Sequence, residues 1–168
     1  HLTDPELLWS ELLYGAPAFN SWFFRRSVFE NFGNLDAGIE ISADRDFLTR
    51  LAIAGIWPDS LLGPCYSYLR HAESATFEPA VELVLAQLHE HIAMAERLVV
   101  GPMDHVQRSR IANWCAFERY QLLIRLWRHR GLARAVGGLL HVLVAEPAWP
   151  ILRWSHIVGQ VGGFAKVY

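Results

Sequence analysis

The sequence predicts an α+β fold that is mostly helical, with a mixed N-terminal part (residues 1–75) and a helical C-terminal part (residues 76–168). Two observations favour this class. Short segments rich in aromatic and apolar residues, at 19–24 and 65–69, are typical of strands. Apolar residues recur at three- and four-residue steps through most of the second part, which is the pattern of amphipathic helices.

Helix start and stop signals divide the first part into three helices. Asp4 before Pro5 predicts a helix over residues 4–14, because Asp caps a helix and Pro suits its first position. Residues 27–32 predict one or two helical turns that end at a glycine. Residues 45–54 predict a third helix from the spacing of their apolar side chains.

Similar signals predict three longer helices and a final amphipathic stretch in the second part. The first helix covers about residues 76–100 and ends at a Gly-Pro pair. The second covers residues 104–130, with Asp104 as its cap, and the third covers residues 132–145. The last stretch starts near residue 149.

The composition excludes two classes of protein. With 52% hydrophobic and 19% charged residues, the chain has enough apolar side chains for a core and is not a disordered tail. Its two cysteines are too few for a disulfide scaffold in 168 residues. We expect both to be buried thiols in a reducing compartment. The longest apolar run, residues 135–145, is about half of the ~20 residues that a membrane span needs.

The charge is divided unevenly along the chain. Residues 1–107 contain six arginines and fifteen acidic residues, whereas residues 108–168 contain eight arginines and one lysine against two acidic residues. Such a basic half either pairs with the acidic half of its own chain or faces an anionic partner. Arginine and tryptophan around an apolar stripe in residues 120–168 suit a membrane surface, with packing or oligomer contacts as the alternative. We expect no nucleic-acid partner, since lysine is almost absent and no nucleic-acid-binding motif occurs.

Four short motifs follow one another over residues 20–76. They are FFRRSVFE at 23–30, FGNLD at 32–36, ADRDFLTRLA at 43–52 and YLRHAESAT at 68–76. Their order and spacing resemble the acceptor-side half of the family 2 nucleotide-sugar glycosyltransferases of the GT-A type.

The resemblance implies a GT-A α/β domain, of which residues 1–75 form the acceptor-side half, followed by a helical extension. It also implies an inverting transfer of a sugar from a nucleotide-sugar donor to a glycan or a lipid-linked acceptor. The family's nucleotide-binding half, with its metal-binding Asp-x-Asp, does not match any segment of this chain. We therefore expect the chain to be part of a longer enzyme and to be inactive alone.

The resemblance matches Asp44 to the catalytic base, which removes the proton of the attacking acceptor hydroxyl. A carboxylate at a helix start suits this task because the helix dipole keeps it ionised. The alternative is an ordinary role as N-cap of the following helix. Two features depart from the family: Ala43 replaces the usual Glu, and the positive charge of Arg45 beside Asp44 would weaken a base. Asp46 is a candidate substrate ligand, and the alternatives are an exposed acid of the first helical turn or a residue that orients a neighbour.

Five other residues are candidates for binding the substrates. The resemblance implies that His71 reaches the metal or the diphosphate, that Arg70 offsets the diphosphate charge and that Ser74 binds phosphate. The alternative for these three is a surface turn ahead of a capped helix. Asp36 and Trp22 are candidates for binding the acceptor sugar, with a loop-ordering acid and a buried aromatic ring as the alternatives.

The resemblance further implies a cofactor, partners and a location. We expect a divalent cation, Mg²⁺ or Mn²⁺, in the full-length enzyme and none bound to this part of it. The expected partners are the nucleotide-sugar donor and the acceptor, with a peripheral membrane surface and a second copy of the chain left open. The expected location is the cytoplasm, or the inner face of the membrane. A noncatalytic helical module that binds a partner or a membrane surface is the alternative function.

Overall fold

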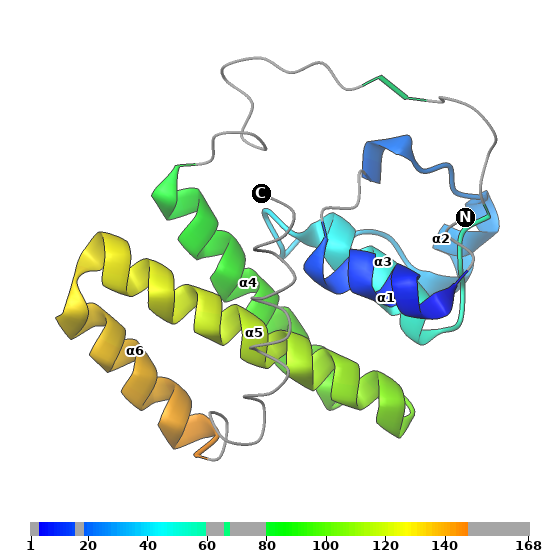
Figure 1. Cartoon of the computed structure of the whole chain (residues 1–168). Helices are drawn as coiled ribbons and strands as arrows, with labels where there is room; N and C mark the ends of the chain where they lie inside the picture. Colours follow the sequence, from blue (N-terminus) through cyan, green and yellow to red (C-terminus); the bar gives the residue numbers. More distant parts are fainter. Residues whose placement is uncertain (1–3, 16–18, 60–65, 68–79, 148–168) are drawn as a thin grey trace. The chain divides into compact units, whose positions relative to one another are not determined.

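The computed structural model describes residues 4–15, 19–59, 66–67 and 80–147 (Figure 1). These residues form six α-helices and one short 3-10 helix, and no β-strand occurs among them. The α+β class that the sequence predicts, an acceptor-side half of an α/β domain with a few strands, is therefore wrong: the described part of the chain is all-helical. The chain divides into two compact units, residues 1–79 (unit 1) and 80–168 (unit 2).

Unit 1 contains three helices, α1 (Pro5–Tyr14), α2 (Arg26–Phe32) and α3 (Ala43–Ile53). The first begins as predicted, since the Asp4 side chain accepts a hydrogen bond from the Glu6 backbone N–H (2.9 Å). Its apolar face is buried, and α1 packs against α3. The start of α3 is thus held by a neighbouring helix within the same unit.

The predicted strand at residues 19–24 is not formed. Its first half is the 3-10 helix Phe19–Ser21, and the rest has no regular structure. A strand needs a neighbouring strand for its backbone hydrogen bonds, and none of the described segments provides one. The second predicted strand, at 65–69, lies outside the described residues apart from 66–67, which have no regular structure.

Two of the aromatic residues that suggest a strand, Phe19 and Phe24, pack instead near one buried ring, that of Phe47 in α3, and Phe29 of α2 joins them, whereas Phe23 is exposed. The ring centroids of Phe24 and Phe29 each lie 5.3 Å from the centroid of Phe47, and the Phe19 centroid lies 6.3 Å from it. Tilted, offset and edge-to-face rings at such distances attract one another. This aromatic cluster fixes the chain before and within α2 against α3.

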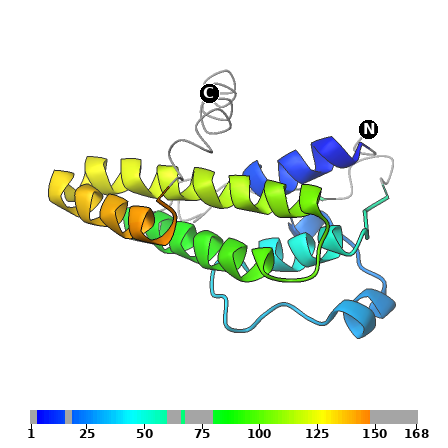
Figure 2. The same ribbon diagram turned by 90° about the horizontal axis from the view of Figure 1, so that it is seen from below.

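Unit 2 contains α4 (Val81–Val99), α5 (His105–Arg130) and α6 (Leu132–Ala145), which lie side by side (Figure 2). The middle helix, α5, packs against both of the others. The predicted bounds of α5 and α6 are confirmed. The segment 76–79, with which the predicted first helix begins, lies outside the described residues.

Local signals explain both ends of α5. At its start, the Asp104 side chain accepts a hydrogen bond from the Gln107 backbone N–H (2.8 Å), and the Gln107 side chain accepts one from the Asp104 backbone N–H (3.2 Å). At its end, Gly131 has a φ of 82°, which glycine adopts without the strain that a side chain would cause. Between these ends, Leu122 packs against Leu88 of α4.

Candidate functional site

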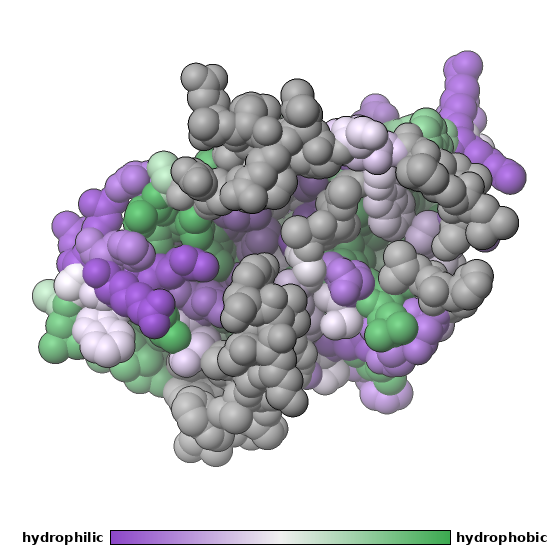
Figure 3. Space-filling view, turned by 45° about the horizontal axis from the view of Figure 1, so that its top comes forward, coloured by the Kyte–Doolittle hydropathy of each residue, from purple (hydrophilic) through white to green (hydrophobic). Residues whose placement is uncertain are grey.

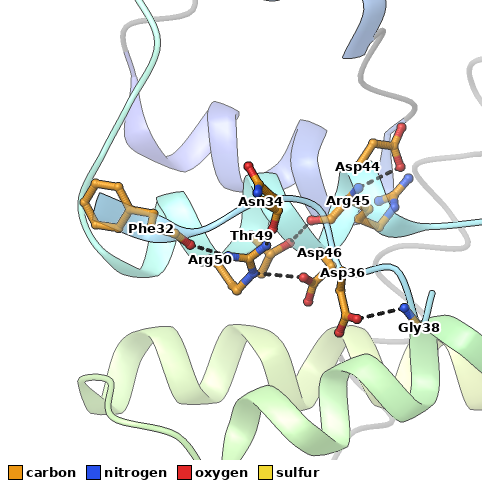
Figure 4. A network of polar contacts seen from close by, with 9 residues as sticks. All are labelled: Phe32, Asn34, Asp36, Gly38, Asp44, Arg45, Asp46, Thr49 and Arg50. Carbon is orange, nitrogen blue, oxygen red and sulfur yellow. Dashed lines mark hydrogen bonds and ion pairs between the residues drawn. The ribbon is translucent and has the colours of Figure 1, made fainter. Parts of the chain in front are cut away.

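The candidate catalytic residue lies in the first turn of α3 (Figure 4). The helix begins at Ala43 and Ser42 occupies the N-cap position, so the prediction that Asp44 is the N-cap is wrong. Asp44 is half-buried, and its Oδ1 accepts a hydrogen bond from the backbone N–H of Arg45 (2.7 Å). No group among the described residues bonds to its Oδ2 or forms an ion pair with it.

Asp46, two residues further along, has a different environment. Its side chain is 1% exposed, and its Oδ2 accepts a hydrogen bond from the Nε of Arg50 (2.9 Å). The Arg50 guanidinium also donates to the backbone carbonyls of Phe32 (2.6 Å) and Asn34 (2.7 Å), which ties α3 to the end of α2 and the loop beyond it. The prediction that Asp46 is an exposed acid is wrong, whereas the alternative that it orients a neighbour agrees with its ion pair to Arg50. A sugar would reach the Asp46 carboxylate only after this ion pair opened.

Arg45, between the two acids, anchors α3 to α1. Its guanidinium donates hydrogen bonds to the backbone carbonyls of Leu12, of Leu13 (2.9 Å) and of Gly15 (2.7 Å), at the C-terminal end of α1. The last carbonyls of a helix have no partner within the helix and carry partial negative charge, so a buried cation stabilises them.

Sequence reasoning missed this anchor, although one signal could have found it. Arg45 precedes Leu48 and Ala52 by three and seven residues, which places it on the buried face of α3. An arginine on such a face needs acceptors from another segment to offset its burial.

The three charged residues of this helical turn therefore have different partners. Arg45 is bound to the end of α1 and Asp46 is bound to Arg50, whereas Asp44 is bound only to a backbone amide of its own helix. The arrangement can therefore present one half-buried carboxylate, held on a rigid helix, to a substrate.

Asp36 orders the loop between α2 and α3. Its Oδ1 accepts a hydrogen bond from the Gly38 backbone N–H (2.9 Å), and its carbonyl accepts one from the Ile39 backbone N–H (3.1 Å). This is the geometry of an Asx turn. The loop-ordering alternative is thus confirmed, and Figure 4 shows the Asp36 carboxylate directed toward Gly38 and away from Asp44. The structure does not bring these two carboxylates together.

Trp22 is half-buried and packs its ring on Phe24, with centroids 6.2 Å apart and planes 18° apart. Part of the indole therefore remains open to a ligand. The other three candidates, Arg70, His71 and Ser74, lie outside the described residues. Within the described ranges, no three His, Cys, Asp or Glu side chains form a cluster that could hold a metal ion.

A second polar cluster, which sequence reasoning also missed, lies in unit 2 between α4 and α5. Oε1 of Glu118 accepts a hydrogen bond from the indole N–H of Trp114 (2.8 Å) and lies 3.1 Å from Nδ1 of His91. All three side chains are buried. Nε2 of His91 has no hydrogen-bond partner in the part of the chain that the structure describes. With one ring nitrogen used and the other enclosed by protein, this cluster is built for packing and not for contact with a ligand.

A third cluster holds the end of α6 to the bundle. Arg119 donates hydrogen bonds to the carboxylates of Glu96 (2.8 Å) and Glu146 (2.6 Å). Beside it, burial raises the pKa of the Cys115 thiol to about 11, and the carboxylate of Glu96 adds to this effect against the opposing charge of Arg119. A thiol with such a pKa is protonated at neutral pH, which makes Cys115 a poor nucleophile.

Comparison of the chain with models of known protein families, with curated protein sequences and with solved structures gives no match. The resemblance to nucleotide-sugar glycosyltransferases therefore stays a prediction that rests on the four motifs of residues 20–76. What the structure adds is the environment of Asp36, Asp44 and Asp46, the three acids within those motifs that it describes.

Proposed function

We propose that this chain supplies the acceptor-side part of an inverting nucleotide-sugar glycosyltransferase, and that Asp44 is its general base. The supporting observation is the first turn of α3. There, Asp44 keeps a carboxylate oxygen that no described residue bonds, while Arg45 is bound to the end of α1 and Asp46 is bound to Arg50 of the same helix. The type of reaction, inverting sugar transfer, is inferred from the resemblance of the four motifs of residues 20–76 to nucleotide-sugar glycosyltransferases.

The reaction needs one base on the acceptor side. The acceptor hydroxyl oxygen attacks the anomeric carbon of the donor, and the bond from that carbon to the diphosphate breaks. The nucleoside diphosphate leaves with the electron pair of that bond, and the configuration at the anomeric carbon inverts. Asp44 takes the hydroxyl proton on its unbonded oxygen and later releases it to water.

The neighbours of Asp44 act as positioning residues. Arg45 holds the helix start to α1, and the Asp46–Arg50 pair holds the same turn to the loop after α2. A base on a helix fixed from two sides keeps the geometry that proton transfer requires. In this proposal Trp22 borders the acceptor site, where the half-buried indole offers an apolar face for a sugar ring, and Asp36 orders the loop between α2 and α3.

The divalent cation that the resemblance implies finds no suitable donors in the described ranges, where no cluster of three potential ligands occurs. The predicted ligand His71, with Arg70 and Ser74, lies outside them. In the proposed transfer, the steps are therefore assigned only to residues of this chain. The proposal of Mg²⁺ or Mn²⁺ in the full-length enzyme rests on the resemblance.

The test uses the full-length protein that carries this chain. It is mixed with a panel of uridine, guanosine and thymidine diphosphate sugars and with a lipid and glycan extract as the source of acceptor, and released nucleoside diphosphate is measured. We expect the wild-type protein to consume at least one donor and Asp44→Asn to lose this activity. Asp4→Asn is the matched control, because Asn caps a helix as well as Asp does.

Two results would contradict the proposal. If no donor releases nucleoside diphosphate, the proposal that this protein catalyses sugar transfer from a nucleotide sugar is wrong. If Asp44→Asn releases nucleoside diphosphate as fast as the wild type, the protein catalyses the transfer but Asp44 is not the general base. The circular dichroism and the nucleotide-sugar affinity of Asp44→Asn are measured in parallel, since a base acts on the rate and not on folding or donor binding.

A noncatalytic interaction module is the second candidate, and one observation favours it. The outward side of α6 exposes large apolar side chains, among them Leu132 and Val144. A chain that consumes no donor but binds a partner through α6 would have this function.

A further inference from the structure

The feature that carries a further inference is the outward side of α6. Its inward side is used by α5: Val142 is buried against Ala116, and Gly138 approaches α5 so closely that a Cβ there would lie 3.1 Å from the Leu123 side chain. The outward side exposes five large apolar residues, which we call the α6 apolar face: Leu132, Val136, Leu139, Leu140 and Val144.

These five residues form one continuous stripe. Four of them follow at intervals of four residues, so each is rotated only about 40° from the one before, and Leu139 widens the stripe on one side. Val144 is 83% exposed and Leu132 is 66% exposed. Scattered apolar residues are normal on a surface, but a contiguous stripe marks an interaction site.

Positive charge and an indole ring lie at the start of this stripe. Trp127, in the last turn of α5, is 60% exposed. Arg128 and Arg134 flank the α5–α6 turn and form no ion pair with any described residue. Figure 3 shows hydrophilic and hydrophobic residues next to one another on the surface of unit 2. In the sequence, no acidic residue occurs between Glu118 and Glu146.

We propose that the α6 apolar face binds the surface of an anionic phospholipid bilayer, with Arg128 and Arg134 on the headgroup phosphates. An amphipathic helix of this kind lies in the plane of the interface, with its apolar side chains at the boundary of headgroups and acyl chains. Exposed Trp is favoured at the same depth. Each Arg near an anionic surface strengthens binding.

The helix geometry fits a helix that lies on the membrane. With 14 residues α6 is about 21 Å long, shorter than the ~30 Å hydrocarbon core of a bilayer. None of the described helices is long and apolar enough to span a membrane.

The distribution of charge argues against a second copy of the chain as the partner that covers the α6 apolar face. A symmetric pair would place the same face of each copy in one interface. That face and its border carry two arginines without an ion pair to any described residue, and they carry no acidic residue, so the same face of a second copy would offer no opposite charge. A bilayer rich in anionic lipid supplies both the apolar phase and the opposite charge.

The experiment is co-sedimentation of the full chain with vesicles of phosphatidylcholine and phosphatidylglycerol, compared with vesicles of phosphatidylcholine alone. Two double variants change the proposed surface: Leu140→Ser with Val144→Ser, and Arg128→Gln with Arg134→Gln. All four positions lie on the surface of the helices, so we expect both variants to fold. Circular dichroism checks this.

Two matched controls make the same chemical changes elsewhere. Val100→Ser changes an 81% exposed valine in the turn after α4. Arg26→Gln removes an arginine of unit 1 whose side chain is 92% exposed and is paired only with Glu30 on the surface. Neither position belongs to the α6 apolar face or its border.

We expect binding only to the vesicles that contain phosphatidylglycerol. The loss of both arginines should weaken this binding on the order of twentyfold, at about fivefold each. The loss of both apolar side chains should weaken it tenfold or more. The two controls should change it less than twofold, and added salt should weaken it in the wild-type chain.

Three results would overturn the proposal. The first is an absence of sedimentation with the anionic vesicles. The second is sedimentation that both double variants leave unchanged. The third is a lipid-free dimer that Leu140→Ser with Val144→Ser converts to a monomer, because a second copy would then cover the face. Size-exclusion chromatography with light scattering measures the third.

Discussion

Replacing Glu118 by alanine should be among the most destabilising single changes in unit 2. The Glu118 carboxylate is buried and serves two buried donors, the indole N–H of Trp114 at 2.8 Å and Nδ1 of His91 at 3.1 Å. The alanine variant removes the acceptor and leaves both partners in place. Nε2 of His91 already lacks a partner, so the histidine would then have no hydrogen bond from its ring.

The expected loss in the free energy of unfolding follows from the number of buried donors that lose their acceptor. A buried polar group that loses its partner costs about 1–3 kcal/mol, and two donors are affected here. The shortened side chain also leaves unfilled volume between α4 and α5, which adds about 1 kcal/mol. We therefore expect Glu118→Ala to lower the free energy of unfolding by about 3–7 kcal/mol, a large share of the ~5–15 kcal/mol typical of a domain.

The assay is urea unfolding followed by circular dichroism, with two comparison variants. Glu118→Gln keeps an acceptor oxygen for the indole N–H and should cost only about 1–2 kcal/mol. Glu82→Ala removes an exposed carboxylate of α4 whose ion pair with Arg130 lies on the surface, so it should change the free energy by less than about 1 kcal/mol. A loss below 1 kcal/mol for Glu118→Ala, or equal losses for Glu118→Ala and Glu82→Ala, would refute this reasoning.

Two further predictions concern other buried groups. Burial raises the pKa of the Cys115 thiol from 9.0 to about 11, so the fraction of thiolate at pH 8 is about a hundredfold smaller in the folded chain. Iodoacetamide should therefore modify Cys115 at least a hundredfold more slowly in the folded chain than in the urea-unfolded chain. Equal rates, measured by peptide mass spectrometry, would contradict this prediction. Arg45→Met should lower the free energy of unfolding by about 2–4 kcal/mol, because it leaves the end of α1 without its donors. Arg26→Met, at a fully solvated position, should have little effect, and a similar loss in both variants would show that the anchor is not important.

The sequence predicted the helices of unit 2 well because their limits are local. Asp104 and Gln107 form a capping box within four residues, and Gly131 takes a backbone conformation that ends α5 and precedes α6. These signals need no knowledge of the rest of the fold. The N-terminal limit of α1, set by Asp4 and Pro5, was predicted for the same reason.

The strand at residues 19–24 was predicted wrongly because a strand is not a local structure. Aromatic residues are common in strands, but they are equally suited to packing around a buried ring, as Phe24 packs on Phe47. Which of the two occurs depends on whether another segment offers a row of backbone donors and acceptors. The described residues contain no such row.

The candidate site was predicted in part. The sequence located the acids of α3, but it did not show that Asp46 is buried on Arg50 or that Arg45 reaches three carbonyls about thirty residues earlier. The contacts of Arg45 and the contact of His91 with Glu118 join segments far apart in sequence. Asp46 and Arg50 are only four residues apart, but the burial of Asp46 depends on how the rest of unit 1 packs around it. Asp44 was located by a motif, whereas its unbonded carboxylate oxygen could be seen only in the structure.

The central claim is that Asp44 takes the proton of the acceptor hydroxyl. The most direct test is the transfer rate of Asp44→Asn in the full-length protein at saturating donor and acceptor, measured beside the dissociation constant of the nucleotide sugar. The account predicts a rate about 10²–10⁴-fold below that of the wild type with an unchanged dissociation constant. A rate within a few-fold of the wild type would contradict it.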